Sequence, residues 1–235
     1  MLFTDLTIYK NRKLFSDGQE QRNWIDTYAL FHLLTNTKFT KVLEIGYLKG
    51  FTFSLMYDCL YPTAEYFTSC DITYTNDIAS SLINFKNCEF IETNSNNLIL
   101  NKTYNFIIID GKHTHQYVTN ELKLCYNALE PNGIILVDDY SASAHPGVAA
   151  ALDKFLLEHP EITPVLVGHQ QIFLSRQPLE ETVLQSIINN TKLFLTWDTV
   201  YWLATDVKIP RYQAKLESLV GKFTELIKIV ETKQI

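Results

Sequence analysis

The sequence predicts an α/β fold with a Rossmann-like, doubly wound and mostly parallel sheet of seven strands. Short apolar runs alternate with helical segments over residues 38–176, as expected for parallel strands joined by helical crossovers. Two of these runs, 106–110 and 134–139, end abruptly in aspartates, and a third, 41–46, ends in a glycine-bearing turn. Buried parallel strands deliver polar side chains to the carboxyl edge of a sheet in this way.

The elements follow from hydrophobic period and from the positions of glycine and proline. The strands are predicted at residues 41–46, 65–70, 88–93, 102–110, 134–138, 163–167 and 171–175. The helices between them are predicted at residues 51–60, 76–85, 117–129 and 146–158. Pro131-Asn132-Gly133 is expected to form a tight turn. Only three residues separate the last two strands, too few for a crossover helix, so the sheet is predicted to end with an antiparallel strand.

We expect one domain with two flanking additions. Residues 1–37 are interpreted as an arm and an amphipathic helix (19–35), and residues 177–235 as a C-terminal helical appendage that covers the site or forms a dimer face. The appendage contains the aromatic residues Trp197, Tyr201 and Trp202. They either form an aromatic wall for a ring-shaped ligand or pack in a core or a dimer interface.

Composition excludes several classes of partner. The formal charge of −6 and the absence of a long run among the 20 Lys and Arg residues argue against nucleic acid. No run approaches the roughly 18 apolar residues of a membrane span, and the start resembles no secretion signal. The four cysteines are scattered without a C-x-x-C pair, which favours reduced thiols. We therefore expect a cytoplasmic protein.

The aspartates at the strand ends indicate a functional site. Asp110, Asp138 and Asp139 are expected to meet at one edge of the sheet, because parallel strands end together there. Clustered carboxylates repel one another and resist burial, so the cluster predicts a divalent cation, a cationic substrate or an unusual pKa. The alternative is structural: Asp138 caps a turn, Asp139 is solvated and Asp110 binds backbone amides.

A second group of residues indicates a nucleoside-type ligand. Gly46 follows the first strand directly and Gly50 opens the next helix, an arrangement that lets a ligand approach the backbone. Asp71 ends the second strand, where a carboxylate can accept hydrogen bonds from both ribose hydroxyls. Because the third glycine of the dinucleotide motif is missing, the pattern favours an adenosine-containing ligand without a pyrophosphate. Alternatively, the turn only packs a helix, with Glu44 as a buried cap.

These segments together resemble a known family. The wording of KVLEIGYLKG, of IIIDGKHTHQYVTNELKLCYNALEPNGIILVDDY and of the following GVAAALDKF is similar to that of class I S-adenosylmethionine-dependent methyltransferases. Within that class, the D-G-x-H motif with a later D-D resembles metal-dependent O-methyltransferases of the sugar, natural-product and catechol type. The resemblance covers about residues 38–176 and implies that the chain is an enzyme.

The resemblance also implies roles for individual residues. Gly46 and Gly50 would line the methionine part of S-adenosylmethionine, with Glu44 near its amino group and Asp71 at the ribose. The remaining cofactor positions would be Asn94 and Ser95 near the adenine, together with Asp110. Asn94 departs from the acidic residue that the family usually carries there.

The resemblance further implies a metal centre and a base. Asp110, Asp138 and Asp139 match the carboxylates that hold a divalent ion, for which oxygen ligands favour Mg²⁺, with Mn²⁺ or Ca²⁺ as substitutes. His113 lies at the position of the catalytic base, and its ordinary pKa of about 6.5 suits that role. His145 either lies on the rim of the metal site or is structural.

The predicted function is metal-assisted transfer of a methyl group to a hydroxyl of a small molecule, by a chain that can form homo-oligomers through its terminal helices. The alternatives are a metal-independent O- or N-methyltransferase and a catalytically inactive cofactor-binding or scaffold protein. The sequence does not identify the acceptor.

Overall fold

The computed structural model describes residues 33–48, 50–74, 85–168, 170–191, 195–202 and 205–212. The helices predicted at 19–35 and 76–85 lie largely outside these ranges, and residues 213–235 of the predicted helical appendage lie wholly outside them. In the part of the chain that is described, no helix is long and apolar enough to cross a membrane.

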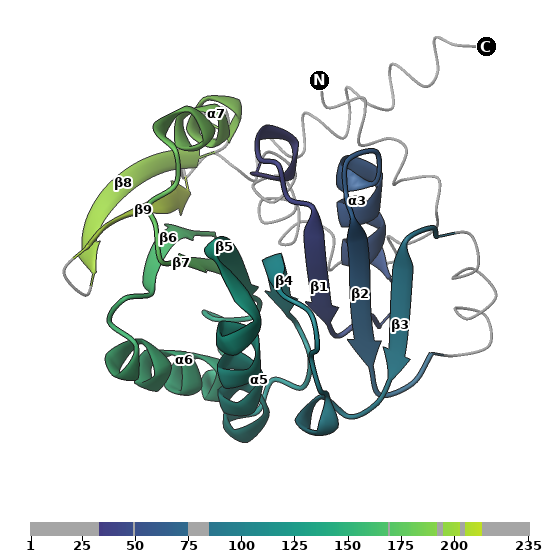
Figure 1. Cartoon of the computed structure of the whole chain (residues 1–235). Helices are drawn as coiled ribbons and strands as arrows, with labels where there is room; N and C mark the ends of the chain where they lie inside the picture. The colour runs from purple at the N-terminus through teal and green to yellow at the C-terminus, as the bar shows by residue number, and fades with distance from the viewer. Residues whose placement is uncertain are drawn as a thin grey trace, which may run out of the picture.

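The core is a seven-stranded sheet with the order β3-β2-β1-β4-β5-β7-β6 (Figure 1). Its strands are β1 (Lys41–Ile45), β2 (Tyr66–Asp71), β3 (Cys88–Glu92), β4 (Tyr104–Ile109), β5 (Leu129–Val137), β6 (Thr163–Val167) and β7 (Ile172–Ser175). Only β7 runs against its neighbours, pairing antiparallel with both β5 and β6. The predicted fold class, including the antiparallel strand near the C-terminal end, is therefore confirmed.

Helices cover both faces of this sheet. They are α3 (Phe51–Leu60), α5 (His115–Ala128), α6 (Pro146–Glu158) and α7 (Glu181–Thr191). In β4, Phe106 and Ile108 pack in the apolar cluster that includes α3, whereas Ile107 and Ile109 pack in the cluster that includes α5 and α6. Because both faces are buried, the central strands read as unbroken apolar runs instead of alternating ones.

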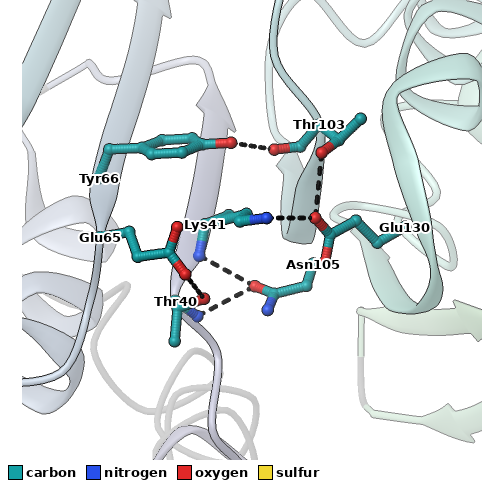
Figure 2. Close-up of polar contacts among 7 residues, drawn as sticks. All are labelled: Thr40, Lys41, Glu65, Tyr66, Thr103, Asn105 and Glu130. Carbon is teal, nitrogen blue, oxygen red and sulfur yellow. Dashed lines mark hydrogen bonds and ion pairs between the residues drawn. The ribbon is translucent and has the colours of Figure 1, made fainter.

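A polar network closes the amino edge of the sheet, opposite the aspartates (Figure 2). The Asn105 side-chain oxygen accepts hydrogen bonds from the backbone N–H groups of Thr40 (3.1 Å) and Lys41 (3.0 Å). Glu130, in β5, accepts from the Lys41 ammonium at 2.7 Å and from the Thr103 hydroxyl at 3.0 Å. These bonds tie β1 to β4 and β5 before the strands run toward the site.

Two expectations about the local structure need correction. The helical interpretation of the C-terminal appendage is wrong for residues 195–212, which form the antiparallel hairpin β8 (Leu195–Trp202) and β9 (Thr205–Tyr212), with β9 beside β6. The β-branched and aromatic residues of this segment favour strands, and the two runs are joined by only two residues, as in a hairpin. The expected tight turn at Pro131-Asn132-Gly133 lies within β5, where Tyr104 pairs with Leu129 and Phe106 with Ile134, so the intervening residues bulge out of the ladder.

Candidate active site

The turn after β1 is closely packed at both glycines. Gly46 has a φ of 98°, and a Cβ added there would lie 1.9 Å from the backbone oxygen of Asp110. Gly50 has a φ of 73°, and its added Cβ would lie 2.3 Å from the ring of Tyr47. A side chain at either position would therefore displace backbone or an aromatic ring. The turn lies between β1 and β4, where the strand order of the sheet reverses. Ligands usually bind at this position in such sheets.

Asp71 holds this turn in place. Its Oδ2 accepts hydrogen bonds from the backbone N–H groups of Tyr47 and Leu48, both at 2.8 Å, and its Oδ1 accepts one from Ile72 at 2.6 Å. A carboxylate offers about four lone pairs, so about one remains for a further donor. Asp71 can thus receive one ribose hydroxyl in this arrangement, and a second only if the turn releases it. Its role at the ribose stays a prediction.

Glu44 lies inside the protein beneath the turn. It is 1% exposed and its Oε2 accepts a hydrogen bond from the Ser69 hydroxyl at 3.2 Å. Burial raises the pKa of this carboxyl well above its ordinary value, and the negative charges of Asp110 and Asp71 raise it further. Its predicted contact with the amino group of the cofactor is not tested by this placement, in which the carboxyl is closed off from solvent.

Asn94 and Ser95, which were predicted to lie near an adenine, form hydrogen bonds with other protein groups. The Asn94 amide nitrogen donates to the Tyr117 hydroxyl at 2.8 Å, and its oxygen accepts from the backbone of Asn96 at 3.0 Å. The Ser95 hydroxyl donates to Glu121 at 2.5 Å. These bonds fix the short helix η2 (Ser95–Asn97) against α5, so a ligand would have to compete with them or use backbone groups.

Glu121 is a site residue that the sequence reasoning missed. It is 1% exposed, its Oε2 is buried without a hydrogen-bond partner in the described structure, and burial raises its pKa. It lies below Gly111, whose added Cβ would be 2.8 Å from Glu121 Oε1. The available signal was its position between Val118 and Cys125 on the buried stripe of α5, where a carboxyl is unusual.

The predicted aspartates and His113 do come together. Asp110 follows β4, and Asp138 and Asp139 follow β5. Asp138 lies close enough to Asp110 to lower the pKa of that carboxyl, against the effect of burial. His113 lies between the carboxyls of Asp110 and Asp139. Its Nε2 is 3.1 Å from Asp110 Oδ1, and its Nδ1 is 3.0 Å from Asp139 Oδ2. The sequence thus located a real cluster, although no contact shows that all three aspartates face a common point.

The two carboxylates set the charge of His113. Hydrogen bonds to Asp110 and Asp139 raise the pKa of His113 to about 10, although partial burial opposes this shift. In return, the His113 imidazolium lowers the pKa of Asp139. The pKa of Asp110 is nevertheless raised, because burial outweighs the bond to His113. At neutral pH, His113 is therefore a cation in this arrangement and not a free base.

His145, the residue that precedes α6, also belongs to the cluster. Its Nε2 lies 3.4 Å from Asp139 Oδ2, and its ring centroid lies 4.6 Å from that of His113. Asp139 itself has a φ of 56°, a left-handed conformation uncommon for aspartate. Two neighbours of His113 in the sequence lie elsewhere: Lys112 places its ammonium over the Tyr117 ring, and His115 begins α5. His145, whose role the sequence left open, is thus part of the cluster.

The donor atoms that converge are not those of the three predicted metal ligands. Within the described residues, the group of at least three metal-ligating side chains whose donors all lie within 4.8 Å of one another is His113, Asp139 and His145. Asp110 and Asp138 lie near this group but do not share its donor set. The ligand set of Asp110, Asp138 and Asp139 stays a prediction.

Comparison with known proteins agrees with the fold. Residues 43–140, which span the glycine turn and all three aspartates, match a family model described as a methyltransferase domain. A search of curated proteins gives no match.

Solved structures share the fold at low sequence identity. The methyltransferase PaMTH1 of Podospora anserina, with bound S-adenosylhomocysteine, is 20% identical (TM-score 0.50, 71% of this chain and 84% of that chain). CalS11, a TDP-rhamnose 3'-O-methyltransferase of calicheamicin biosynthesis, is 14% identical (TM-score 0.54, 73% and 86%). MycE, a methyltransferase of the mycinamycin pathway with bound Mg and S-adenosylhomocysteine, is 16% identical (TM-score 0.51, 72% of this chain but 53% of that chain). Residues 43–140 thus match a methyltransferase domain, and the sheet as a whole has the fold of these solved methyltransferases.

Proposed function

We propose that the protein transfers the methyl group of S-adenosylmethionine to a hydroxyl of a small molecule, with a divalent ion bound at the same site. The observation that carries the acceptor class is His113 between the carboxyls of Asp110 and Asp139, beside the glycine turn. A hydroxyl must lose its proton as it is methylated, and a group of carboxyls and imidazoles at the reacting edge supplies acceptors for it. CalS11, a sugar O-methyltransferase with this fold, supports the same acceptor class.

In the proposed reaction, the acceptor oxygen attacks the methyl carbon of the sulfonium. A carbon–oxygen bond forms, the carbon–sulfur bond breaks with its electron pair on sulfur, and S-adenosylhomocysteine leaves. The hydroxyl proton passes to the cluster. A bound divalent ion would lower the pKa of the hydroxyl and fix its direction. Gly46 and Gly50 give the turn after β1 its shape, and Asp71, which holds that turn, offers its remaining lone pair to the ribose.

Two assignments of roles are compatible with this proposal. In the assignment made from the sequence, Asp110, Asp138 and Asp139 hold the ion and His113 is the base. His113 can act as a base near neutral pH only after a cation takes over one of its carboxylates, because these raise its pKa to about 10. In the second assignment, His113 is itself a ligand of the ion.

Cofactor binding and methyl transfer can be tested separately. Calorimetry with S-adenosylhomocysteine should show binding at micromolar concentrations, and no binding at high micromolar concentrations would refute the cofactor assignment for this chain. Radiolabelled S-adenosylmethionine should then be offered with matched pairs of acceptors that carry a hydroxyl or an amine on the same ring. Transfer to the amines alone would favour an N-methyltransferase. Full activity on hydroxyls after chelation would remove the ion from the mechanism.

A further inference from the structure

His113, Asp139 and His145 have the chemical composition of a transition-metal site. They offer two imidazole nitrogens and one carboxylate oxygen, and their donor atoms lie within 4.8 Å of one another. Imidazole suits Zn²⁺, Fe²⁺, Co²⁺ and Ni²⁺, whereas Mg²⁺ and Ca²⁺ prefer oxygen ligands. Two histidines and a carboxylate that leave positions open are also the donor set of catalytic zinc sites and of non-haem iron sites.

The distances agree with the edges of a coordination shell. Asp139 Oδ2 lies 3.0 Å from His113 Nδ1 and 3.4 Å from His145 Nε2. Ligands about 2.1 Å from an ion lie about 3.0 Å apart at octahedral angles and about 3.4 Å apart at tetrahedral angles. Both distances from Asp139 therefore suit a shared ion, and the two imidazole donors lie within 4.8 Å of each other.

A second observation comes from the far side of the His113 ring. Its other nitrogen, Nε2, lies 3.1 Å from Asp110 Oδ1. Histidines that bind metals nearly always donate their second ring N–H to a carboxylate or a carbonyl, which fixes the tautomer and leaves the first nitrogen's lone pair for the ion. Asp110 is thus placed to orient His113 and not to contact the ion. This is the relationship expected if His113 is a ligand.

The three side chains are also accessible and held by separate elements. The exposed fractions of the side chains are 19% for His113, 18% for Asp139 and 39% for His145, so an ion and its water can enter. The residues come from the segment before α5, the end of β5 and the residue before α6. Asp139 has a left-handed backbone conformation, and its carboxyl approaches the rings of both His113 and His145. Such conformations often mark functional sites.

We infer that the divalent ion of this protein is a transition metal bound by His113 Nδ1, Asp139 Oδ2 and His145 Nε2, with Asp110 as the hydrogen-bond partner of His113. The inference deepens the proposed function and rests on it only for the ion's part in methyl transfer. Binding of the ion requires neither cofactor nor acceptor. It can therefore fail while cofactor binding and methyl transfer stand, and the reverse is also true.

The test is a titration of the chelator-stripped full chain with Co²⁺, Zn²⁺ or Mg²⁺ alone. We expect one Co²⁺ to bind with a visible absorption band, Zn²⁺ to displace it at equal concentration, and Mg²⁺ to leave it bound at about 100-fold excess. Failure of the wild-type chain to bind Co²⁺, or displacement of Co²⁺ by equimolar Mg²⁺, would overturn the inference.

Variants distinguish the two ligand sets. His145→Ala and Asp139→Asn should weaken Co²⁺ binding at least about tenfold, since loss of even an indirect partner of a metal site costs about 10- to 100-fold. Asn tolerates the left-handed conformation at position 139, so the second variant should fold. Asp138→Asn should bind Co²⁺ as the wild type does. The control is His159→Ala, which removes another histidine–carboxylate pair, 3.3 Å from Glu161. Loss of Co²⁺ binding in Asp138→Asn with retention in His145→Ala would instead establish the three-aspartate centre.

Discussion

At the scale of single residues, Gly46 connects the cofactor turn to the cluster. Its Cβ position is occupied by the backbone oxygen of Asp110, and its φ of 98° strains any other residue. We predict that Gly46→Ala lowers the free energy of unfolding by about 2 kcal/mol or more, through strain and a shift of the β4 end. Urea denaturation measures this loss, and calorimetry should show weaker binding of S-adenosylhomocysteine.

Gly133→Ala is the matched control for this substitution. Its added Cβ would meet the Leu129 side chain at 2.5 Å, which can move, and it lies at the other edge of the sheet. We expect a smaller loss of stability and unchanged cofactor binding. Equal effects of the two substitutions on binding would show that Gly46 has no special connection to the site.

Glu44 gives a pH dependence of stability whose sign can be worked out. Burial, and then the charge of Asp110, raise the pKa of its carboxyl above the ordinary 4.5, so the folded protein holds this proton more tightly than the unfolded chain. Its contribution to stability is present below pH 4.5 and is lost as the pH rises through the folded pKa. Glu44→Gln keeps a partner for Ser69 without titrating. The stability of this variant relative to the wild type should therefore rise from pH 4 to pH 8, as measured by urea denaturation. Parallel profiles would contradict the prediction.

At the scale of elements, the amino edge of the sheet is held by Asn105. Its oxygen accepts from two backbone N–H groups of the segment entering β1 (Figure 2), and removal of that acceptor leaves both unsatisfied. We predict that Asn105→Ala costs about 1–3 kcal/mol of unfolding free energy. Asn105→Asp keeps the acceptor and should recover most of the loss. If the two variants are equally destabilised in thermal unfolding, the hydrogen bonds are not the cause.

The elements also show what could be predicted from the sequence. Apolar runs such as 106–109 and 134–137 identified central strands because they are buried on both faces, and Pro146 marked the start of α6 correctly. Residues 195–212 were misassigned because aromatic and β-branched residues were attributed to a helical pattern, although two such runs joined by two residues favour a hairpin. Similarly, the position of Asp139 followed from the end of β5, but its left-handed backbone did not.

At the scale of the whole molecule, the sequence predicted which residues share an edge but not which partners they take. Strand ends brought Asp110, Asp138, Asp139 and His113 together, as a parallel sheet requires. His145 enters through the loop between β5 and α6, and that contact has no local sequence signature. Glu121 enters through the packing of α5, where its position on the buried stripe indicates burial but not its bond to Ser95. Partner choice in such a cluster depends on side-chain geometry at sub-ångström scale, which a motif does not encode.

The two edges of the sheet should respond differently to the cofactor. A ligand that binds only the folded chain stabilises it by about 2.7 kcal/mol at 100 times its dissociation constant. S-adenosylhomocysteine should therefore raise the unfolding temperature of the wild type and, by a similar increment, that of Asn105→Ala, which is weakened at the opposite edge. Asp71→Ala frees the amides of Tyr47 and Leu48 and removes the predicted ribose partner, so its increment should fall to near zero. Differential scanning fluorimetry with and without the ligand measures all three. If S-adenosylhomocysteine raises the unfolding temperature of Asp71→Ala as much as that of the wild type, the cofactor binds away from the β1 turn. A ligand bound at this turn would be affected by the loss of Asp71, because Asp71 holds the turn in place.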